Sequence, residues 1–142
     1  MTATTLLDVN VLLALSWDQH VHHELAHARF HELDRWSTTP ATEAGLLRLL
    51  LTESVVGRRV SGQEALGQLM ALRAVSGWSM IADTATLADP LIDMRILMGR
   101  RQVTDLQLVN LAATQASTLT TFDADIRESL IPDERHWVNV WL

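Results

Sequence analysis

The stretch Leu6–Leu15, with the sequence LLDVNVLLAL, predicts a strand that is followed at once by a helix. The short run Thr5–Leu7 has the apolar character of a buried strand, and it stops at Asp8. From Asn10 to Trp17 the apolar residues recur at helical spacing. A strand that leads directly into a helix is the first half of a βαβ unit, which is the building block of α/β folds.

The same alternation of short strands and helices continues along the chain. Thr39 can cap a helix that has Pro40 in its first turn. Ser61 can cap the next helix, which Gly77 is expected to end. This order predicts a parallel sheet covered on both faces, with ligands bound beyond the carboxyl ends of the strands. The expected strands are 5–7, 37–39, 78–82, 118–122 and 136–141, and the expected helices are 10–17, 20–36, the segment from 40 past 50, the segment after 61, 84–98 and 105–115.

The length and composition fit one domain that spans residues 1–142. With 142 residues, 48% of them hydrophobic, the chain can bury about 70% of the surface that its unfolded form exposes. No apolar run reaches the ~18–20 residues of a membrane span, and Met1–Thr5 lacks the basic region of a signal peptide. The chain has no cysteine, which excludes disulfides and thiolate metal sites. Together these features favour a cytoplasmic protein that does not bind membranes.

All 11 basic residues are arginine, and the net charge is −6. The absence of lysine argues against P-loop nucleotide hydrolysis, Schiff-base chemistry and protein-kinase activity, because each of these needs a lysine. An acidic chain is also a poor non-specific binder of nucleic acid, since affinity for phosphates comes largely from Lys and Arg. If the protein acts on nucleic acid, metal ions must supply much of the positive charge.

Four acidic residues lie at strand exits or helix starts. Asp8 and Asp123 each follow an expected strand, and Glu43 and Asp105 lie in the first turns of expected helices. Each of them alone is most simply interpreted as a helix cap or a turn residue. Together they would converge at one edge of the sheet, where carboxylates held a few ångströms apart either take up protons or hold a cation. Hard oxygen ligands suit Mg²⁺ or Mn²⁺, so the set predicts a metal-dependent site.

Other enzyme classes that have an acid after the first strand, or a site at this edge, need residues that the chain lacks. Haloacid dehalogenases use Asp-x-Asp and a distant lysine, but the third position here is Asn10. Response-regulator receivers also need a lysine. A serine hydrolase of the α/β type would need the nucleophile elbow G-x-S-x-G, which does not occur in the sequence.

The ordered set of acids resembles the PIN-domain family, and in particular the VapC toxins of bacterial toxin–antitoxin pairs. The resemblance is carried by LLDVNVLLAL, TTPATEAGLLRLL, VTDLQLVNLAATQ and LTTFDADI, which together run from Leu6 to about Asp125. It implies an α/β fold, namely a PIN-like α/β/α sandwich with a central, mainly parallel sheet. The matching positions are Asp8, Asn10, Glu43, Asp105, Thr121 and Asp123.

The resemblance also implies an activity and partners. These are Mg²⁺-dependent (or Mn²⁺-dependent) endonucleolytic cleavage of RNA, a VapB-type antitoxin that plugs the active site, and a homodimer. In this interpretation Asp8, Asp105 and Asp123 bind one or two ions, which polarise the scissile phosphate and activate a water. Glu43 binds the second ion or orients that water. Because water rather than the ribose 2′-hydroxyl attacks, the products are expected to carry 5′-phosphate and 3′-hydroxyl ends.

Three polar residues near these acids have alternative roles. Thr121 can hydrogen-bond a carboxylate or a phosphate, or it can serve only as a strand residue. Asn10 is expected to tie down the turn behind Asp8 rather than to touch substrate. Asp125 can be a fifth acid at the rim of the site, but the preferred interpretation is a cap for the turn 126–130.

Histidines, arginines and tryptophans suggest further contacts. Four histidines fall on one expected helical face near Asp18, which is compatible with a zinc site but is more typical of a half-exposed amphipathic face. His22 points away from that face. The five tryptophans fit a core or a dimer interface, and so do the leucines of the helix that carries Glu43. The histidines are His20, His23, His27 and His31, and the candidates for RNA phosphate contacts are Arg48, Arg58, Arg59, Arg100 and Arg101.

Two further interpretations stay open beside the ribonuclease. A non-catalytic PIN-like module would bind RNA or a partner protein and would use the four acids as helix caps. A structure-specific DNA nuclease would cut DNA flaps with the same carboxylates. Loss of metal-dependent turnover in Asp8→Asn or Asp105→Asn separates the first interpretation from an enzyme, and substrate competition tests the second.

Overall fold

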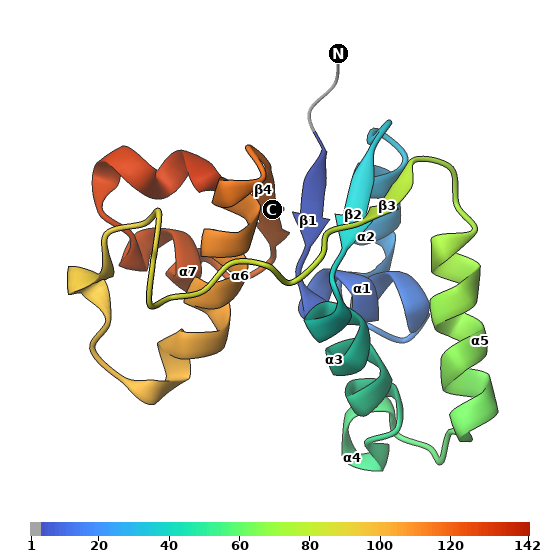
Figure 1. Cartoon of the computed structure of the whole chain (residues 1–142). Helices are drawn as coiled ribbons and strands as arrows, with labels where there is room; N and C mark the ends of the chain where they lie inside the picture. Colours follow the sequence, from blue (N-terminus) through green and yellow to red (C-terminus); the bar gives the residue numbers. More distant parts are fainter. Residues whose placement is uncertain (1–3) are drawn as a thin grey trace.

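The computed structural model describes residues 4–142, and its centre is a five-stranded sheet in which all neighbouring strands are parallel (Figure 1). The strand order is β3-β2-β1-β4-β5, so the chain starts in the middle of the sheet and builds outwards in both directions. The strands are β1 (Thr5–Leu7), β2 (Trp36–Thr38), β3 (Trp78–Met80), β4 (Thr118–Thr121) and β5 (Val138–Val140). Residues 1–3 lie outside the described residues; they belong to the segment Met1–Thr5, which was expected not to be a signal peptide.

Helices cover both faces of the sheet, as the predicted α/β/α sandwich requires. Leu7 packs into a core with Leu12, Trp36 and Leu46, whereas its neighbour Leu6 packs into a second core on the opposite face. Because successive side chains of a strand point to opposite faces, two adjacent leucines in β1 serve two cores. The helices are α1 (Val9–Ser16), α2 (His23–Phe30), α3 (Pro40–Leu50), α4 (Glu53–Val56), α5 (Gly62–Arg73), α6 (Val103–Thr114) and α7 (Ala124–Ser129), with the 3-10 turns η1 (Met94–Ile96), η2 (Arg100–Gln102) and η3 (Pro132–Trp137).

The starts of α1, α3 and α5 follow from local sequence. Asp8 accepts a hydrogen bond from the Val9 amide at the start of α1. Ser61 caps α5 as predicted, with its hydroxyl accepting from the Glu64 amide at 3.0 Å. Thr39 precedes α3 as predicted, but its hydroxyl has no partner among the described residues, and the Thr39 amide donates instead to the Thr42 hydroxyl at 3.0 Å.

The helix predicted at 84–98 is wrong. Apart from the single turn η1, this segment is irregular, and Pro90 lies in its middle. The side chain of Asn110, which is fully buried in α6, accepts from the Leu91 amide at 2.8 Å and donates to the Thr86 carbonyl at 3.3 Å. These tertiary hydrogen bonds satisfy backbone groups that would otherwise need a helix, and they anchor the segment beside the core.

The helix predicted at 20–36 is too long. Only His23–Phe30 is helical, and Trp36 belongs to β2, where it is completely buried and lies opposite Trp78 of β3. The Trp36 amide donates to the Gly77 carbonyl at 3.0 Å, so Gly77 forms the turn into β3 rather than the end of α5. The short helix α4 was not predicted, and the other strands differ from prediction only at their ends.

The helices within residues 4–142 are too short or too polar to cross a membrane. This finding agrees with the absence of a long apolar run in the sequence.

Gly77→Ala tests the close approach that sets β3 beside β2. Gly77 has φ +95°, and an added Cβ would lie 2.1 Å from the Asp34 carbonyl oxygen. We expect the free energy of unfolding in urea to fall by roughly 1–3 kcal/mol from the backbone conformation alone, and by more from the clash. The control is Gly67→Ala in α5, where an added Cβ meets nothing within 4 Å, and we expect it to stabilise by roughly 0.5–1 kcal/mol. Equal stability of the two variants would contradict this account.

Candidate active site

Three neighbouring strands deliver acidic residues to one edge of the sheet. Asp8 follows β1, Asp123 follows β4, and Glu43 lies in the first turn of α3, which starts just after β2. Since β2, β1 and β4 are adjacent and parallel, their carboxyl ends lie side by side at the same edge. Asp105 reaches this edge from the first turn of α6.

Thr121 at the end of β4 links the two central strands. Its hydroxyl donates to the Asp8 carboxylate at 2.8 Å and accepts from the amide of Asp123 at 3.1 Å. It also accepts from the Asn10 side chain at 3.1 Å, and Asn10 in turn accepts from the Phe122 amide at 3.3 Å. The Thr121 hydroxyl therefore uses its one donor and both acceptor positions. Of the two roles open to it, Thr121 bonds a carboxylate, and Asn10 fastens α1 to the end of β4.

Asp8 is the most buried acid of the group, with 6% of its surface exposed. Burial raises the pKa of Asp8, the hydrogen bonds from Thr121 and the Val9 amide lower it, and the nearby charge of Asp123 raises it again; the net direction is upward. Asp8 is thus a carboxylate held in place by two donors against the cost of losing its hydration.

Asp105 faces the charges of two other acids. Partial burial and the negative charges of Asp8 and Asp123 raise the pKa of Asp105 to about 6. Within residues 4–142 its carboxylate receives no hydrogen bond that would offset these effects. Asp8, Asp105 and Asp123 therefore form one electrostatically coupled group, and Glu43, the fourth acid of the predicted set, is not among the charges that act on Asp8 or Asp105.

Glu43 has a different environment. Its Oε2 accepts from the Thr38 hydroxyl at 2.6 Å and lies 3.8 Å from Nε of Arg73. The Glu43 side chain is only 12% exposed, so it is largely buried, and it is paired with Arg73. Glu43 is the one predicted acid that the fold provides with a cationic partner among the described residues.

A cavity of about 370 Å³ lies at the coupled acids. Asp105 and Asp123 line it together with Asp125, and Arg101 from η2 contributes a positive charge to its wall. Asp125 stays at this rim, and the prediction that it caps α7 is wrong: the Asp123 carboxylate takes that role and accepts from the Asp125 amide at 2.9 Å. Strand and helix ends thus surround a space that is lined by both acids and an arginine.

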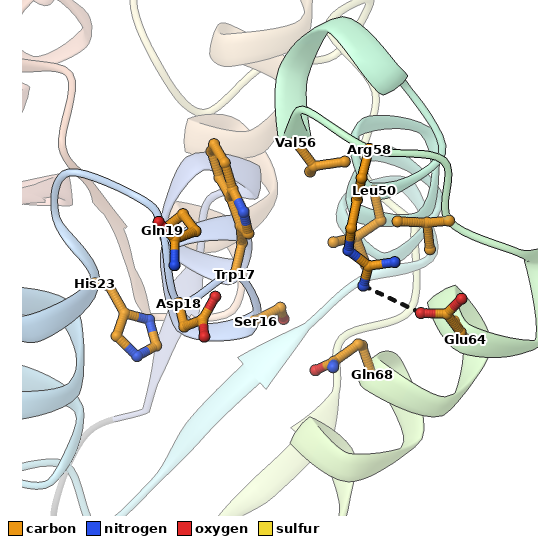
Figure 2. A pocket seen from close by; sticks show the side chains of 11 residues that line it. Ser16, Trp17, Asp18, Gln19, His23, Leu50, Val56, Arg58, Glu64 and Gln68 are labelled. Carbon is orange, nitrogen blue, oxygen red and sulfur yellow. Dashed lines mark hydrogen bonds and ion pairs between the residues drawn. The ribbon is translucent and has the colours of Figure 1, made fainter.

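A larger cavity of about 500 Å³ lies elsewhere, between the end of α1 and the α4–α5 region (Figure 2). Arg58 and Glu64 both line it and form an ion pair with each other at 3.1 Å, so Arg58 is already engaged within the chain. None of the four predicted acids lines this cavity. Size alone therefore does not identify the site, and the chemistry of the lining residues favours the smaller cavity.

The histidine stripe is tied to the backbone. The His23 and His27 rings lie 4.5 Å apart and bond the carbonyl oxygens of Ala14 and Leu15 at 2.7 and 3.0 Å. His20 precedes α2, and no group of three metal-ligating side chains forms a site within residues 4–142. The stripe therefore connects α2 to the end of α1. His22, which was expected to point elsewhere, stacks on Phe122 at 4.6 Å.

Three residues near the site were missed by sequence reasoning: Thr38, Arg73 and Trp78. Thr38 ends β2 as Thr121 ends β4, so the rule that strand exits carry function would have found it. Arg73 and Trp78 gave no local signal, because each reaches Glu43 or Thr38 only through tertiary packing.

Comparison with known proteins gives close relatives in one family. The ribonuclease VapC38 of Mycobacterium tuberculosis is 41% identical over 123 residues, covering 85% of this chain and 86% of that protein. The ribonuclease VapC39 of the same organism is 39% identical over 133 residues, covering 89% and 93%. No family model matches the chain.

A solved structure supports the same grouping at the level of the fold. The crystal structure of Mycobacterium tuberculosis VapC20, a sarcin-ricin loop cleaving toxin, matches with a TM-score of 0.62 at 14% sequence identity, covering 89% of this chain and 96% of that chain. The architecture and the two relatives at about 40% identity over most of both chains agree. The chain therefore belongs to the VapC family of PIN-domain ribonucleases.

Proposed function

We propose that this chain is the toxin of a type II toxin–antitoxin pair and acts as a Mg²⁺-dependent endoribonuclease, with Mn²⁺ able to substitute. The observation that carries this proposal is the coupling of Asp8, Asp105 and Asp123 at the carboxyl edge of the sheet, in a member of a ribonuclease family. The proposal includes an RNA substrate, a VapB-type antitoxin, a homodimer and a cytoplasmic location, and membership of the VapC family supports these parts of it.

The donor set fits a divalent cation. Three carboxylates supply hard oxygen ligands, and the pKa of Asp105 is raised first by burial and then by like-charge repulsion from Asp8 and Asp123, which a cation would relieve. Within residues 4–142 no three His, Cys, Asp or Glu side chains are placed to hold a metal ion together, so the aspartate side chains would have to move for an ion to bind all three. The exposed side chain of Asp123, with only one of its oxygens bonded to a backbone amide, is free to make such a movement.

The mechanism assigns separate tasks to the chain's residues. Asp8, Asp105 and Asp123 would hold a divalent ion, which would supply Lewis-acid chemistry at the scissile phosphate and a bound water of lowered pKa. The hydrogen bonds from Thr121 and the Val9 amide keep Asp8 oriented. Glu43 orients the attacking water and is itself held by Thr38.

Substrate binding falls to arginines near the acids. Arg101 lines the cavity that contains Asp105 and Asp123, and both Arg100 and Arg101 are exposed. An arginine beside a cluster of carboxylates is suited to bind a backbone phosphate of RNA next to the scissile bond. Arg58 is less suited, because it is paired with Glu64.

Purified protein freed of any partner is expected to cut total cellular RNA at discrete positions with Mg²⁺ or Mn²⁺, and to be inactive in EDTA. Products should carry 5′-phosphate and 3′-hydroxyl ends, mapped by ligation-based sequencing. Asp8→Asn and Asp105→Asn should lower the rate roughly a hundredfold or more. A 2′,3′-cyclic phosphate at the cut would contradict water attack. Absence of cleavage by folded, metal-loaded protein would favour the non-catalytic module, and preferential cutting of DNA flaps would favour the DNA nuclease.

Asp105→Asn is expected to stabilise the metal-free protein. Because the pKa of Asp105 in the folded state, about 6, exceeds its ordinary value of 3.8, ionisation costs stability in full above about pH 6. This cost to the free energy of unfolding disappears as the pH falls from about 6 to about 4. After a discount for the half-exposed position, we expect a gain of about 1 kcal/mol at pH 7.5 in EDTA and little gain at pH 4.

Urea denaturation at both pH values measures this effect. The matched control is Asp89→Asn, a fully exposed acid outside the site, which should leave the free energy of unfolding within about 0.5 kcal/mol at either pH. A destabilised Asp105→Asn variant at pH 7.5 would mean that Asp105 is a structural residue.

A further inference from the structure

Two consecutive hydrogen bonds connect Trp78 to Glu43 through Thr38. The indole N–H of Trp78, at the start of β3, donates to the Thr38 hydroxyl at 2.9 Å. That hydroxyl, at the end of β2, donates to Oε2 of Glu43 at 2.6 Å. These two hydrogen bonds therefore connect the outer strand β3, through the neighbouring strand β2, to the acid at the start of α3.

The chemistry of the donors decides which group donates in each of the two hydrogen bonds. An indole N–H can only donate, so Trp78 occupies an acceptor position of the Thr38 oxygen. The single hydroxyl hydrogen of Thr38 is then directed at Glu43. The short distance of 2.6 Å is typical of a hydroxyl that donates to an ionised carboxylate.

The indole itself is held by a cation over its ring and by the position of Trp78 in the sheet. The guanidinium carbon of Arg73 lies 4.1 Å from the centre of the Trp78 ring, and Trp78 lies opposite Trp36 in the parallel register of β2 and β3. Nε of Arg73 also lies 3.8 Å from Oε2 of Glu43, so Arg73 contacts both Trp78 and Glu43, the residues at the two ends of this pair of hydrogen bonds. Neither the indole nor the carboxylate can rotate without losing a contact.

Burial makes these contacts strong. Thr38 is completely buried, and the Glu43 side chain is 12% exposed, so the polar groups act in a medium of low dielectric constant. Both contacts fall on Oε2, whereas within residues 4–142 Oε1 of Glu43 accepts no hydrogen bond. The arrangement fixes the carboxylate through one oxygen and leaves the other available.

We infer that Thr38 and Trp78 are positioning residues for Glu43 and hold its Oε1 ready for the divalent ion or for a water beside it. This inference rests on the proposed function in one respect, namely that Glu43 belongs to the metal-dependent site. A purely structural joint between β2 and β3 would not need a hydroxyl donor aimed at a buried carboxylate, because an apolar pair would pack there without one.

Mn²⁺ affinity, measured from the free-ion signal in electron paramagnetic resonance, tests the inference without RNA. Thr38→Val removes the donor while it keeps the side-chain shape, and the dissociation constant should rise on the order of tenfold. Thr38→Ser restores the hydroxyl and should restore the affinity. Trp78→Phe keeps a ring for Arg73 but removes the N–H, and its affinity should fall between those of the wild type and Thr38→Val.

Trp137→Phe is the matched control. Trp137 is also half-buried, and its indole N–H makes no hydrogen bond within residues 4–142. We expect its Mn²⁺ affinity to equal that of the wild type. For cleavage of RNA, Thr38→Val should lower kcat on the order of tenfold with KM unchanged, because the contact acts on Glu43 and not on the substrate.

The outcomes separate the inference from the proposed function. Wild-type Mn²⁺ affinity in Thr38→Val, or failure of Thr38→Ser to restore a lost affinity, would overturn the inference even if the wild type cleaves RNA. A wild type that binds Mn²⁺ but cuts no RNA would overturn the proposed function, and the affinities of the Thr38 and Trp78 variants would still decide the inference.

Discussion

The hydrogen bond from the Thr121 hydroxyl to the Asp8 carboxylate joins the ends of the two central strands, and the acidic edge of the sheet is organised around it. At 6% exposure Asp8 has lost most of its hydration, which disfavours the charged form. Thr121 and the Val9 amide replace part of that hydration with two fixed donors. Since Asp8 also begins the connection to α1, the same contact aligns α1 with β4, and Asn10 reinforces it.

The acids at this edge of the sheet have two kinds of environment. Glu43 is paired with Arg73 and receives a hydrogen bond, so its charge is balanced within the chain. Asp105 has neither, and partial burial together with the charges of Asp8 and Asp123 raises the pKa of Asp105 to about 6. A group of like charges that costs stability is characteristic of a functional site, because uptake of a proton or a ligand of opposite charge relieves the cost. The unbalanced group, rather than the acids as a whole, is therefore the part of the edge to which we assign the proposed cation.

Where the sequence-based predictions fail, a tertiary contact replaces a local preference. Residues 84–98 have helical spacing of apolar side chains, but the buried Asn110 side chain bonds Leu91 and Thr86 and holds the segment in an irregular path. Trp36 continues the helical pattern of the preceding residues, yet burial and pairing with β3 place it in a strand. Both errors concern segments whose backbone hydrogen bonds are made with residues 19 to about 40 positions away.

The sequence by itself determined the order of the strands, most of the helices, and the positions of Asp8, Glu43, Asp105 and Asp123 at strand exits and helix starts. It also predicted a cation at any site that these acids share. These features depend on hydrophobic period, capping and charge, which act over a few neighbouring residues. Only the tertiary structure decided that Asp8 meets Thr121 across 113 positions, and that Trp78 reaches Thr38 across 40. The order of the strands in the sheet decides which residues far apart in the sequence lie close together in space. Electrostatic coupling and hydrogen bonding depend on that distance in space rather than on the separation along the chain. For that reason the three coupled aspartates and the separately held Glu43 could be distinguished only in the folded protein.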